Sequence, residues 1–156
     1  MSAVFTLTSN SIRPMTESDL DWIMEIEMSV YPHPWTRGIF SDCIKVGYKC
    51  WVLEDEYNII GYTVMSMTIN EVHLLNISIA SNRQNQGLGR QFVIQMCEIA
   101  KQSQADTMLL EVRPSNTIAI HLYDSIGFNE IGIRKNYYPD DNGNREDAII
   151  MAKSLI

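Results

Sequence analysis

Residues 72–94, VHLLNISIASNRQNQGLGRQFVI, contain the turn that decides the fold. The first nine residues are a mostly apolar run, which is typical of a buried strand. A polar stretch then leads to Gly87-Leu88-Gly89, and the apolar residues that follow recur at helical spacing: Phe92, Val93, Met96, Ile99 and Ala100. The sequence therefore predicts a strand over 72–80, a glycine turn and a helix that ends near Gln102.

The next apolar run, Thr107–Val112, is typical of a strand buried in a parallel pair. A strand, a helix and a strand in this order make the two strands parallel neighbours with a right-handed connection. Ser115 is predicted to cap a further helix over 117–126, which Gly127 ends. The remaining elements are two strands and the polar loop between them: 128–135, 148–152 and 140–144.

Upstream of residue 72 the sequence predicts three strands and two helices. Pro14 limits the first strand to a sheet edge, and Thr16 or Ser18 caps the first helix. Two prolines make residues 30–35 irregular, and Thr36 caps the second helix. The strands are 12–15, 48–54 and 59–69; the helices run through Leu20, Ile23, Ile26 and Glu27, and over 37–46. Three meandering strands before a β–helix–β crossover predict a mixed sheet in an α/β (α+β) fold.

The composition suits one globular domain and disfavours several classes of protein. The chain has 156 residues, 46% of them hydrophobic, and its net charge of −7 disfavours binding to nucleic acid. Three scattered cysteines favour neither a disulfide framework nor a zinc site, and they fit a reducing cytosol. Residues 1–10 show no signal peptide, and no apolar run reaches the ~18 residues of a membrane span. We therefore expect one cytoplasmic domain over 1–156, without a metal or a membrane contact.

The loop Gln84-Asn85-Gln86-Gly87-Leu88-Gly89-Arg90 is the first candidate site. Glycines let the backbone approach a ligand closely, and a helix start presents unpaired N–H groups with a partial positive charge. Such a loop suits an anion, above all a pyrophosphate. No Gly-Lys-Ser/Thr follows it, so it is not a P-loop, and it lacks the three-glycine spacing of a dinucleotide fingerprint. The alternative is a glycine turn that only starts a helix.

Glu111 is the second candidate. Strand alternation places it on one face with Leu109 and Arg113, opposite the face of Met108, Leu110 and Val112. A carboxylate in an apolar strand is costly to bury unless it is paired or hydrated, and burial raises its pKa toward that of a general base. The alternative is a glutamate at a strand end, paired with Arg113 or another cation. The spacing alone leaves both interpretations open.

Asn116 and Tyr123 are the third candidate, because they stand two turns apart on one face of the helix after Ser115. Asn116 offers an amide to a ligand, and Tyr123 offers a weakly acidic hydroxyl. The alternative for Tyr123 is an aromatic of the core. A serine hydrolase built on Ser115 or Ser125 is disfavoured, because the chain has no nucleophile elbow.

Several longer segments carry a family resemblance: Gln84-x-x-Gly87-x-Gly89, Pro34-Trp35-Thr36, Asn76-Ile77-Ser78-Ile79, Leu110-Glu111-Val112-Arg113, Leu122-Tyr123-x-x-x-Gly127-Phe128, Arg134-Lys135-Asn136-Tyr137-Tyr138-Pro139 and Arg145-Glu146-Asp147-Ala148. With them the chain resembles the GNAT superfamily of N-acetyltransferases, and within it the bacterial RimI-type ribosomal-protein alanine N-acetyltransferases. The resemblance covers roughly residues 12–152. Two departures are Ser78, where the family often has alanine, and residues 1–10, which we expect to be a flexible extension.

The resemblance implies a mostly antiparallel seven-stranded sheet that splays between its two parallel strands, with about four helices. It implies that acetyl-CoA fills the wedge, that Glu111 is the general base and that Tyr123 is the general acid. The Ile79 N–H would polarise the thioester carbonyl, as oxyanion-hole donors do. The amine would attack the thioester directly, without a covalent enzyme intermediate or a metal. The cofactor-binding residues would be Ile77, Ser78, Ile79, Gln84, Asn85, Gln86, Gly87, Leu88, Gly89, Arg90, Asn116 and Tyr123.

The expected acceptor is the N-terminus of a basic ribosomal protein, which suits the net charge of −7. At pH 7, deprotonation costs ~1–1.4 kcal/mol for an α-amino group and ~4.6 kcal/mol for a lysine, so the N-terminus is the easier substrate. We expect four aromatic residues to form the acceptor mouth: Tyr31, Trp35, Tyr137 and Tyr138. The alternatives are an acetyltransferase for lysines, polyamines or small-molecule amines, and a non-catalytic CoA-binding domain. We expect a monomer or a weak dimer.

Overall fold

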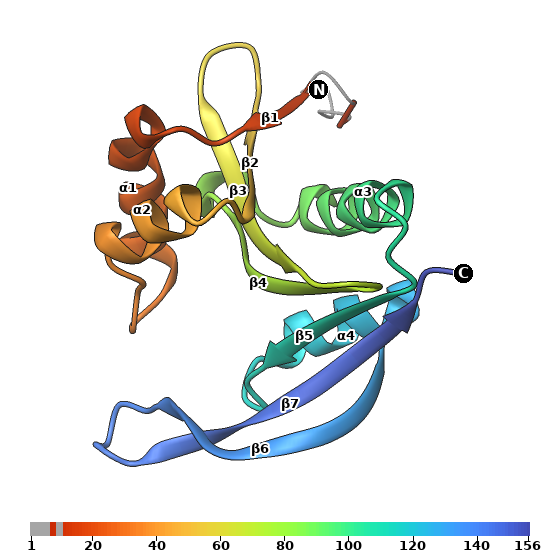
Figure 1. Ribbon diagram of the computed structural model, residues 1–156. Helices are drawn as coiled ribbons and strands as arrows, with labels where there is room; N and C mark the ends of the chain where they lie inside the picture. The colour runs from red at the N-terminus through yellow and green to blue at the C-terminus, as the bar shows by residue number, and fades with distance from the viewer. Residues whose placement is uncertain (1–6, 9–10) are drawn as a thin grey trace. The chain divides into compact units, whose positions relative to one another are not determined.

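The computed structural model describes residues 7–8 and 11–156 (Figure 1). These residues form a seven-stranded sheet in the order β1-β2-β3-β4-β5-β7-β6, together with four α-helices. The strands are β1 (Ile12–Pro14), β2 (Lys49–Glu54), β3 (Ile59–Met67), β4 (Glu71–Ile79), β5 (Thr107–Val112), β6 (Asn129–Pro139) and β7 (Arg145–Ser154). The helices are α1 (Leu20–Val30), α2 (Arg37–Lys45), α3 (Leu88–Gln102) and α4 (Thr117–Ile126). The predicted order of elements and the mixed α/β fold are confirmed.

The chain forms two compact units, and each is described by itself. The first unit comprises Met1–Ser66 and Leu75–Val93, and the second comprises Met67–Leu74 and Ile94–Ile156. The boundary therefore divides two elements, β4 after Leu74 and α3 after Val93. No helix of the described residues is long and apolar enough to cross a membrane. The predicted flexibility of residues 1–10 falls, except for residues 7 and 8, outside the described part of the chain.

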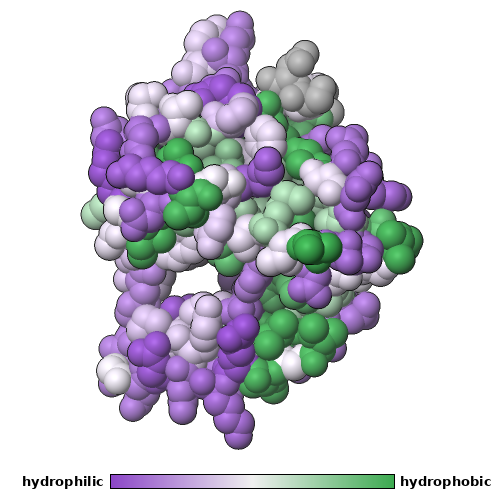
Figure 2. Space-filling model, viewed as in Figure 1, coloured by the Kyte–Doolittle hydropathy of each residue, from purple (hydrophilic) through white to green (hydrophobic). Residues whose placement is uncertain are grey.

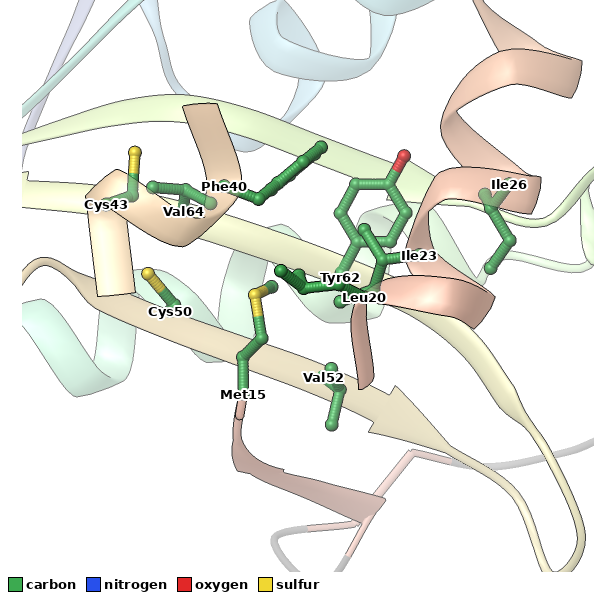
Figure 3. Packing of buried hydrophobic residues seen from close by; sticks show 10 residues of the cluster. All are labelled: Met15, Leu20, Ile23, Ile26, Phe40, Cys43, Cys50, Val52, Tyr62 and Val64. Carbon is green, nitrogen blue, oxygen red and sulfur yellow. The ribbon is translucent and has the colours of Figure 1, made fainter. Parts of the chain in front are cut away.

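The first unit folds around apolar side chains that α1 and α2 place against β2 and β3. Thr16 is the N-cap of a short 3-10 turn that leads into α1, and Thr36 caps α2 by accepting a hydrogen bond from the Ile39 N–H at 3.2 Å. Figure 3 shows the buried cluster, in which the ring of Tyr62 lies among helix side chains. The cluster consists of Met15, Leu20, Ile23, Ile26, Phe40, Cys43, Cys50, Val52, Tyr62 and Val64.

The second unit is built on the pairing of β5 with a parallel and an antiparallel neighbour. Residues Glu71–Leu74 of β4 pair in parallel with Thr107–Leu110, and β7 pairs antiparallel with the other edge of β5. Met108, Leu110 and Val112 are buried and Glu111 lies on the opposite face, as the alternation predicted. The parallel register covers only four residue pairs and ends at Leu74, although both strands continue.

One predicted helix cap and several predicted strand boundaries were wrong. Asn116, not Ser115, caps α4, because Ser115 already donates its backbone N–H and its hydroxyl to Glu146, both at 3.0 Å. Strands β6 and β7 extend beyond 128–135 and 148–152 toward the hairpin end, since Tyr138 pairs with Glu146 and Pro139 with Arg145. The strands were predicted from apolar residues, and the hairpin end has no apolar alternation. Backbone pairing does not need such alternation, so the strands continue where the sequence carries no such signal. Strand β3 ends at Met67 and not at Ile69, because the Thr68 N–H already bonds the Glu71 carbonyl of the turn.

The hairpin of β6 and β7 carries two kinds of surface. Figure 2 shows hydrophobic side chains gathered over the two strands and hydrophilic ones toward the hairpin end. Ile131 and Ile133 of β6 are exposed by 61% and 56%. A strand at the edge of a sheet with one solvated face accounts for the mostly exposed pattern of β6.

Candidate functional site

The loop before α3 in the first unit has the backbone of an anion-binding turn. Asn85 and Gly87 both have positive φ, at 63° and 79°. Backbone N–H groups in such turns form concave anion sites, and the first N–H groups of a helix have no helical acceptor. The side-chain amide of Gln84 donates to the Ile79 carbonyl at 3.0 Å, so Gln84 fixes the loop to the end of β4. The loop is largely exposed, and its conformation fits a bound pyrophosphate.

The end of β4 is packed closely against β3 in the same unit. Ser78 and Ile79 are buried, and Ile77 is half-buried. Gly61 of β3 lies so near that a Cβ built on it would come within 2.7 Å of the Ser78 carbonyl oxygen. Glycine is therefore required at 61, and it fixes the backbone of the strand segment that the resemblance assigns to the pantetheine arm.

Glu27 of α1 is a buried carboxylate, only 2% exposed, and it binds three neutral donors. Its Oε1 accepts from the Tyr62 hydroxyl at 2.6 Å and from the Asn76 side-chain amide at 3.1 Å. Its Oε2 accepts from the Trp35 backbone N–H at 2.9 Å. Burial, and then the charge of Glu27, raise the pKa of Tyr62, so this hydroxyl remains a donor. The network joins α1, β3, β4 and the segment after α1.

Tyr31 fixes the same segment to β4. Its hydroxyl contacts the Ser78 Oγ at 2.7 Å and donates to the Ile77 carbonyl at 3.1 Å. Burial raises the pKa of Tyr31 to about 12. Trp35 packs on Phe40, with the two ring centroids 5.2 Å apart. The two predicted acceptor residues of this unit are therefore part of one ordered segment against β4.

Glu111 in the second unit has a side chain only 8% exposed and is surrounded by polar partners. Its Oε1 lies 3.4 Å from His73 Nε2 and 3.3 Å from Arg134 Nε. The Tyr137 hydroxyl is hydrogen-bonded to it, and burial, followed by that bond, raises the pKa of Tyr137. Arg113 is not the partner of this carboxylate, because its guanidinium binds Glu146 Oε1 at 3.2 Å. Both interpretations of Glu111 survive in part, since its carboxylate is paired with the Arg134 guanidinium near the end of β5 and is also mostly buried.

A bulge in β6 presents the two tyrosines. Asn136 has φ of 52°, and the register with β7 shifts between Arg134 and Tyr138. Arg145 holds the bulge by donating to the Asn136 and Tyr137 carbonyls at 2.8 and 2.9 Å. The rings of Tyr137 and Tyr138 are in edge contact, with centroids 4.9 Å apart. The Arg145 segment therefore shapes the backbone of the tyrosine segment.

The residues of α4 are placed differently from one another. Asn116, the N-cap of α4, accepts a hydrogen bond from the Ala119 N–H at 3.2 Å, so its side-chain oxygen takes part in the helix cap, and its Nδ2 group is a donor that can serve a ligand. Tyr123 is half-buried and its ring meets Phe128 edge-on, with centroids 5.7 Å apart. This contact agrees with the packing alternative for its ring and leaves the role of its hydroxyl as a prediction.

The predicted site residues divide between the units. The first unit holds Tyr31, Trp35, Ile77–Ile79 and Gln84–Arg90, and the second holds Glu111, Asn116, Tyr123, Tyr137 and Tyr138. Within the second unit, Glu111 and Tyr137 are in contact. Sequence reasoning missed three residues: Glu27, His73 and Arg134. Glu27 stands at helical spacing with Leu20 and Ile23, which could have indicated its burial.

No group of three or more His, Cys, Asp or Glu residues that could hold a metal ion occurs in the part of the chain that the structure describes. The cysteines Cys43, Cys50 and Cys97 are buried and free. Burial raises the pKa of Cys97 to about 11, so its thiol is a poor nucleophile at neutral pH.

Comparison with known proteins gives consistent matches. Residues 19–128 match the Acetyltransferase (GNAT) family. The ribosomal protein bS18-alanine N-acetyltransferase of Haemophilus ducreyi is 36% identical over 144 residues, which cover 92% of this chain and 99% of that protein. The crystal structure of the ribosomal-protein-S18-alanine N-acetyltransferase from Escherichia coli matches with a TM-score of 0.86 at 35% identity, covering 92% of each chain. A Bacillus subtilis acetyltransferase in complex with CoA has the same fold, with a TM-score of 0.78 at 21% identity, covering 93% of this chain and 98% of that one.

Proposed function

The chain belongs to the acetyltransferase (GNAT) family, and we propose that it acetylates the α-amino group of an N-terminal alanine of a ribosomal protein. The chain is an acyltransferase, and enzymes of this family take the acetyl group from acetyl-CoA. The relatives named for alanine acetylation of ribosomal protein bS18 match nearly the full length of the chain, which supports the acceptor class. The observation that carries the proposal is Glu111, a mostly buried carboxylate among polar partners on a strand of the parallel pair.

Glu111 is the general base in this proposal, and Tyr123 is the general acid. The deprotonated amine attacks the thioester directly, the N–C bond forms and the C–S bond breaks. The protonated amine first gives one proton to Glu111, through a water molecule, and the Tyr123 hydroxyl protonates the departing thiolate. The second proton, which the nitrogen loses when the amide forms, returns to the Tyr123 phenolate. The backbone N–H of Ile79 polarises the thioester carbonyl.

The acetyl-CoA contacts are proposed for each unit by itself, for the first unit and then for Asn116 of the second. In the exposed loop Gln84–Arg90, the backbone N–H groups from Gln86 to Arg90 hold the pyrophosphate, and the positive φ of Asn85 and Gly87 supports this. Backbone groups of Ile77–Ile79 bind the pantetheine as an added strand would, and Gly61 fixes that segment from β3. Asn116 contributes its Nδ2 group.

The acceptor residues are Tyr31, Trp35, Tyr137 and Tyr138. The fixed local structure around these residues supports this role. Glu27 binds the Trp35 backbone N–H, and Tyr31 bonds to β4. Arg145 holds the segment of Tyr137 and Tyr138 in the β6 bulge. A net charge of −7 favours a basic acceptor protein. The family match crosses both units, which supports a single domain over residues 1–156. Cytoplasmic location and a monomeric or weakly dimeric state remain predictions.

A peptide assay tests the proposal. The substrate is a basic peptide with an N-terminal alanine and internal lysines, and the matched control is the same peptide with a blocked N-terminus. We expect CoA release and labelling of the α-amine with the first peptide only. Labelling of the lysines in both peptides would replace the N-terminal acceptor by a lysine, and binding of acetyl-CoA without turnover would favour a CoA-binding domain.

A variant of the base tests the mechanism. Glu111→Gln is expected to lower kcat by ~10²–10⁴-fold, the contribution usual for general acid–base catalysis. Glu130→Gln, an exposed glutamate of β6, is the control and should leave kcat unchanged. Full activity of Glu111→Gln would remove Glu111 from its role as base.

A further inference from the structure

Each turnover of the proposed reaction releases one net proton in the active site. At pH 7 an α-amino group is mostly protonated, because its pKa is about 7.7–8.0. The nitrogen therefore loses two protons when the N–C bond forms, whereas the thiolate takes up one when the C–S bond breaks. The other proton has to reach solvent.

Glu111 is poorly exposed for releasing that proton itself, since its side chain is 8% accessible. Three side chains of the same unit meet it: Arg134 and Tyr137 from β6, and His73 from β4. Arg134 keeps its protons at any physiological pH, and it has no acceptor atom. The Tyr137 hydroxyl donates a hydrogen bond to the carboxylate and keeps its proton, because its pKa is raised. Of these three partners only His73 can take a proton from Glu111.

The position of His73 suits this transfer. It is opposite Leu109 in the parallel register, so Glu111 lies two residues farther along β5 on the same face. His73 Nε2 is 3.4 Å from Glu111 Oε1, a contact that a shift of a few tenths of an ångström turns into a good hydrogen bond. The His73 side chain is 31% exposed, so the imidazole contacts both the buried carboxylate and solvent.

We propose that His73 is a proton relay that acts through Glu111 and delivers the surplus proton to solvent. This inference rests on the proposed function, in which Glu111 receives the proton of the amine. The protonated Glu111 carboxyl then gives its proton to the Nε2 lone pair of neutral His73, which restores the carboxylate and makes an imidazolium. The imidazolium loses one proton to solvent and returns to the neutral ring. His73 itself touches neither substrate.

The test is a chemical rescue with the N-terminal alanine peptide and acetyl-CoA. His73→Ala is expected to lower kcat by ~10-fold or more, up to the ~10²–10⁴-fold usual for general acid–base catalysis, with little change in either KM. Added imidazole should restore the rate of His73→Ala, in proportion to its concentration, and should not affect the wild type. His73→Gln keeps a polar side chain that cannot carry a proton, and it should be slow as well. His121→Gln, which removes an exposed histidine of α4, is the control.

The outcomes separate the relay from the proposed function. A wild-type kcat in both His73 variants, while Glu111→Gln is inactive, overturns the relay and leaves the base in place. A slow His73→Ala enzyme that imidazole does not restore also overturns it, because a purely structural role would give that result. Full activity of Glu111→Gln would show that Glu111 does not receive the proton of the amine. That result would overturn the proposed mechanism, and the relay with it.

Discussion

Replacing Glu27 tests whether its buried network holds the acceptor segment and β4 together. Glu27→Leu places an apolar side chain of similar length on the buried face of α1 and removes both carboxylate oxygens. Three donors then lose their acceptor: the Tyr62 hydroxyl, the Asn76 amide and the Trp35 backbone N–H. Because these donors stay where they are, the change differs from replacing a whole buried polar group by apolar residues.

The expected loss can be worked out from the contacts. A buried donor left without a partner costs about 1–3 kcal/mol, so three such donors cost at least about 3 kcal/mol together. The variant also removes the desolvation cost of a buried carboxylate, which offsets part of this loss. We therefore expect Glu27→Leu to lower the free energy of unfolding by about 3–5 kcal/mol, out of a usual total of about 5–15 kcal/mol. For a chain of this length that is a fall in Tm of about 6–20 °C.

Urea denaturation followed by circular dichroism measures the loss. Tyr62→Phe removes a single hydrogen bond to the carboxylate and should cost about 1.5–3 kcal/mol, the usual contribution of a hydrogen bond to a charged group. Glu25→Gln, on the exposed side of the same helix, is the matched control and should stay within about 0.5 kcal/mol of the wild type. A loss below about 1 kcal/mol for Glu27→Leu would refute the reasoning, because the three donors would then have other partners.

Three further changes probe strand β3, the loop before α3 and the 3-10 turn that leads into α1. Gly61→Ala places a Cβ 2.7 Å from a carbonyl oxygen of β4; we expect a loss of about 1–3 kcal/mol in urea denaturation and a higher KM for acetyl-CoA. Gly87→Ala strains a backbone with φ of 79° by about 1–2 kcal/mol, and calorimetry should find acetyl-CoA bound up to about tenfold more weakly; an unchanged affinity would remove the loop from the site. The hydrogen bond from Arg13, working against burial, lowers the pKa of Asp19, so this carboxylate stabilises the fold above its unfolded pKa and loses that effect as the pH falls toward its folded pKa. Asp19→Asn should therefore lower Tm at pH 7, with a difference from wild type that shrinks below about pH 4, while Asp21→Asn, whose side chain is 84% exposed, should change Tm little.

Elements with local signals could be predicted from the sequence. Thr36 caps α2, and Gly127 ends α4 with φ of 110°, because both effects depend only on neighbouring residues. Ser115 failed as a cap since a partner distant in sequence, Glu146, occupies it. The same reason hid the full length of β6, where the bulge at Asn136 depends on contacts from β7.

For the candidate site, the sequence predicted which residues take part but not which side chains contact one another. The sequence indicated that Glu111 lies in a buried strand, and its low exposure agrees with this. Its partners could not be found, because they depend on the register of β4 and β5 and on the pairing of β6, none of which appears in the spacing of the residues. For the same reason the alternation along β5 suggested Arg113 as a partner, whereas the contact comes from Arg134.

Two carboxylates with little exposure, Glu27 and Glu111, have different partners, and this difference indicates different uses. Glu27 meets three neutral donors, and none of them takes up a proton at neutral pH, so its network can hold backbone in place but cannot exchange protons. Glu111 meets a guanidinium, a phenol and an imidazole, and the imidazole is partly exposed. A carboxylate that must accept a proton in every turnover needs such a partner to return to its starting state. Burial by itself therefore favours neither residue as the base, and the proton-accepting capacity of the neighbouring His73 supports the proposed role of Glu111.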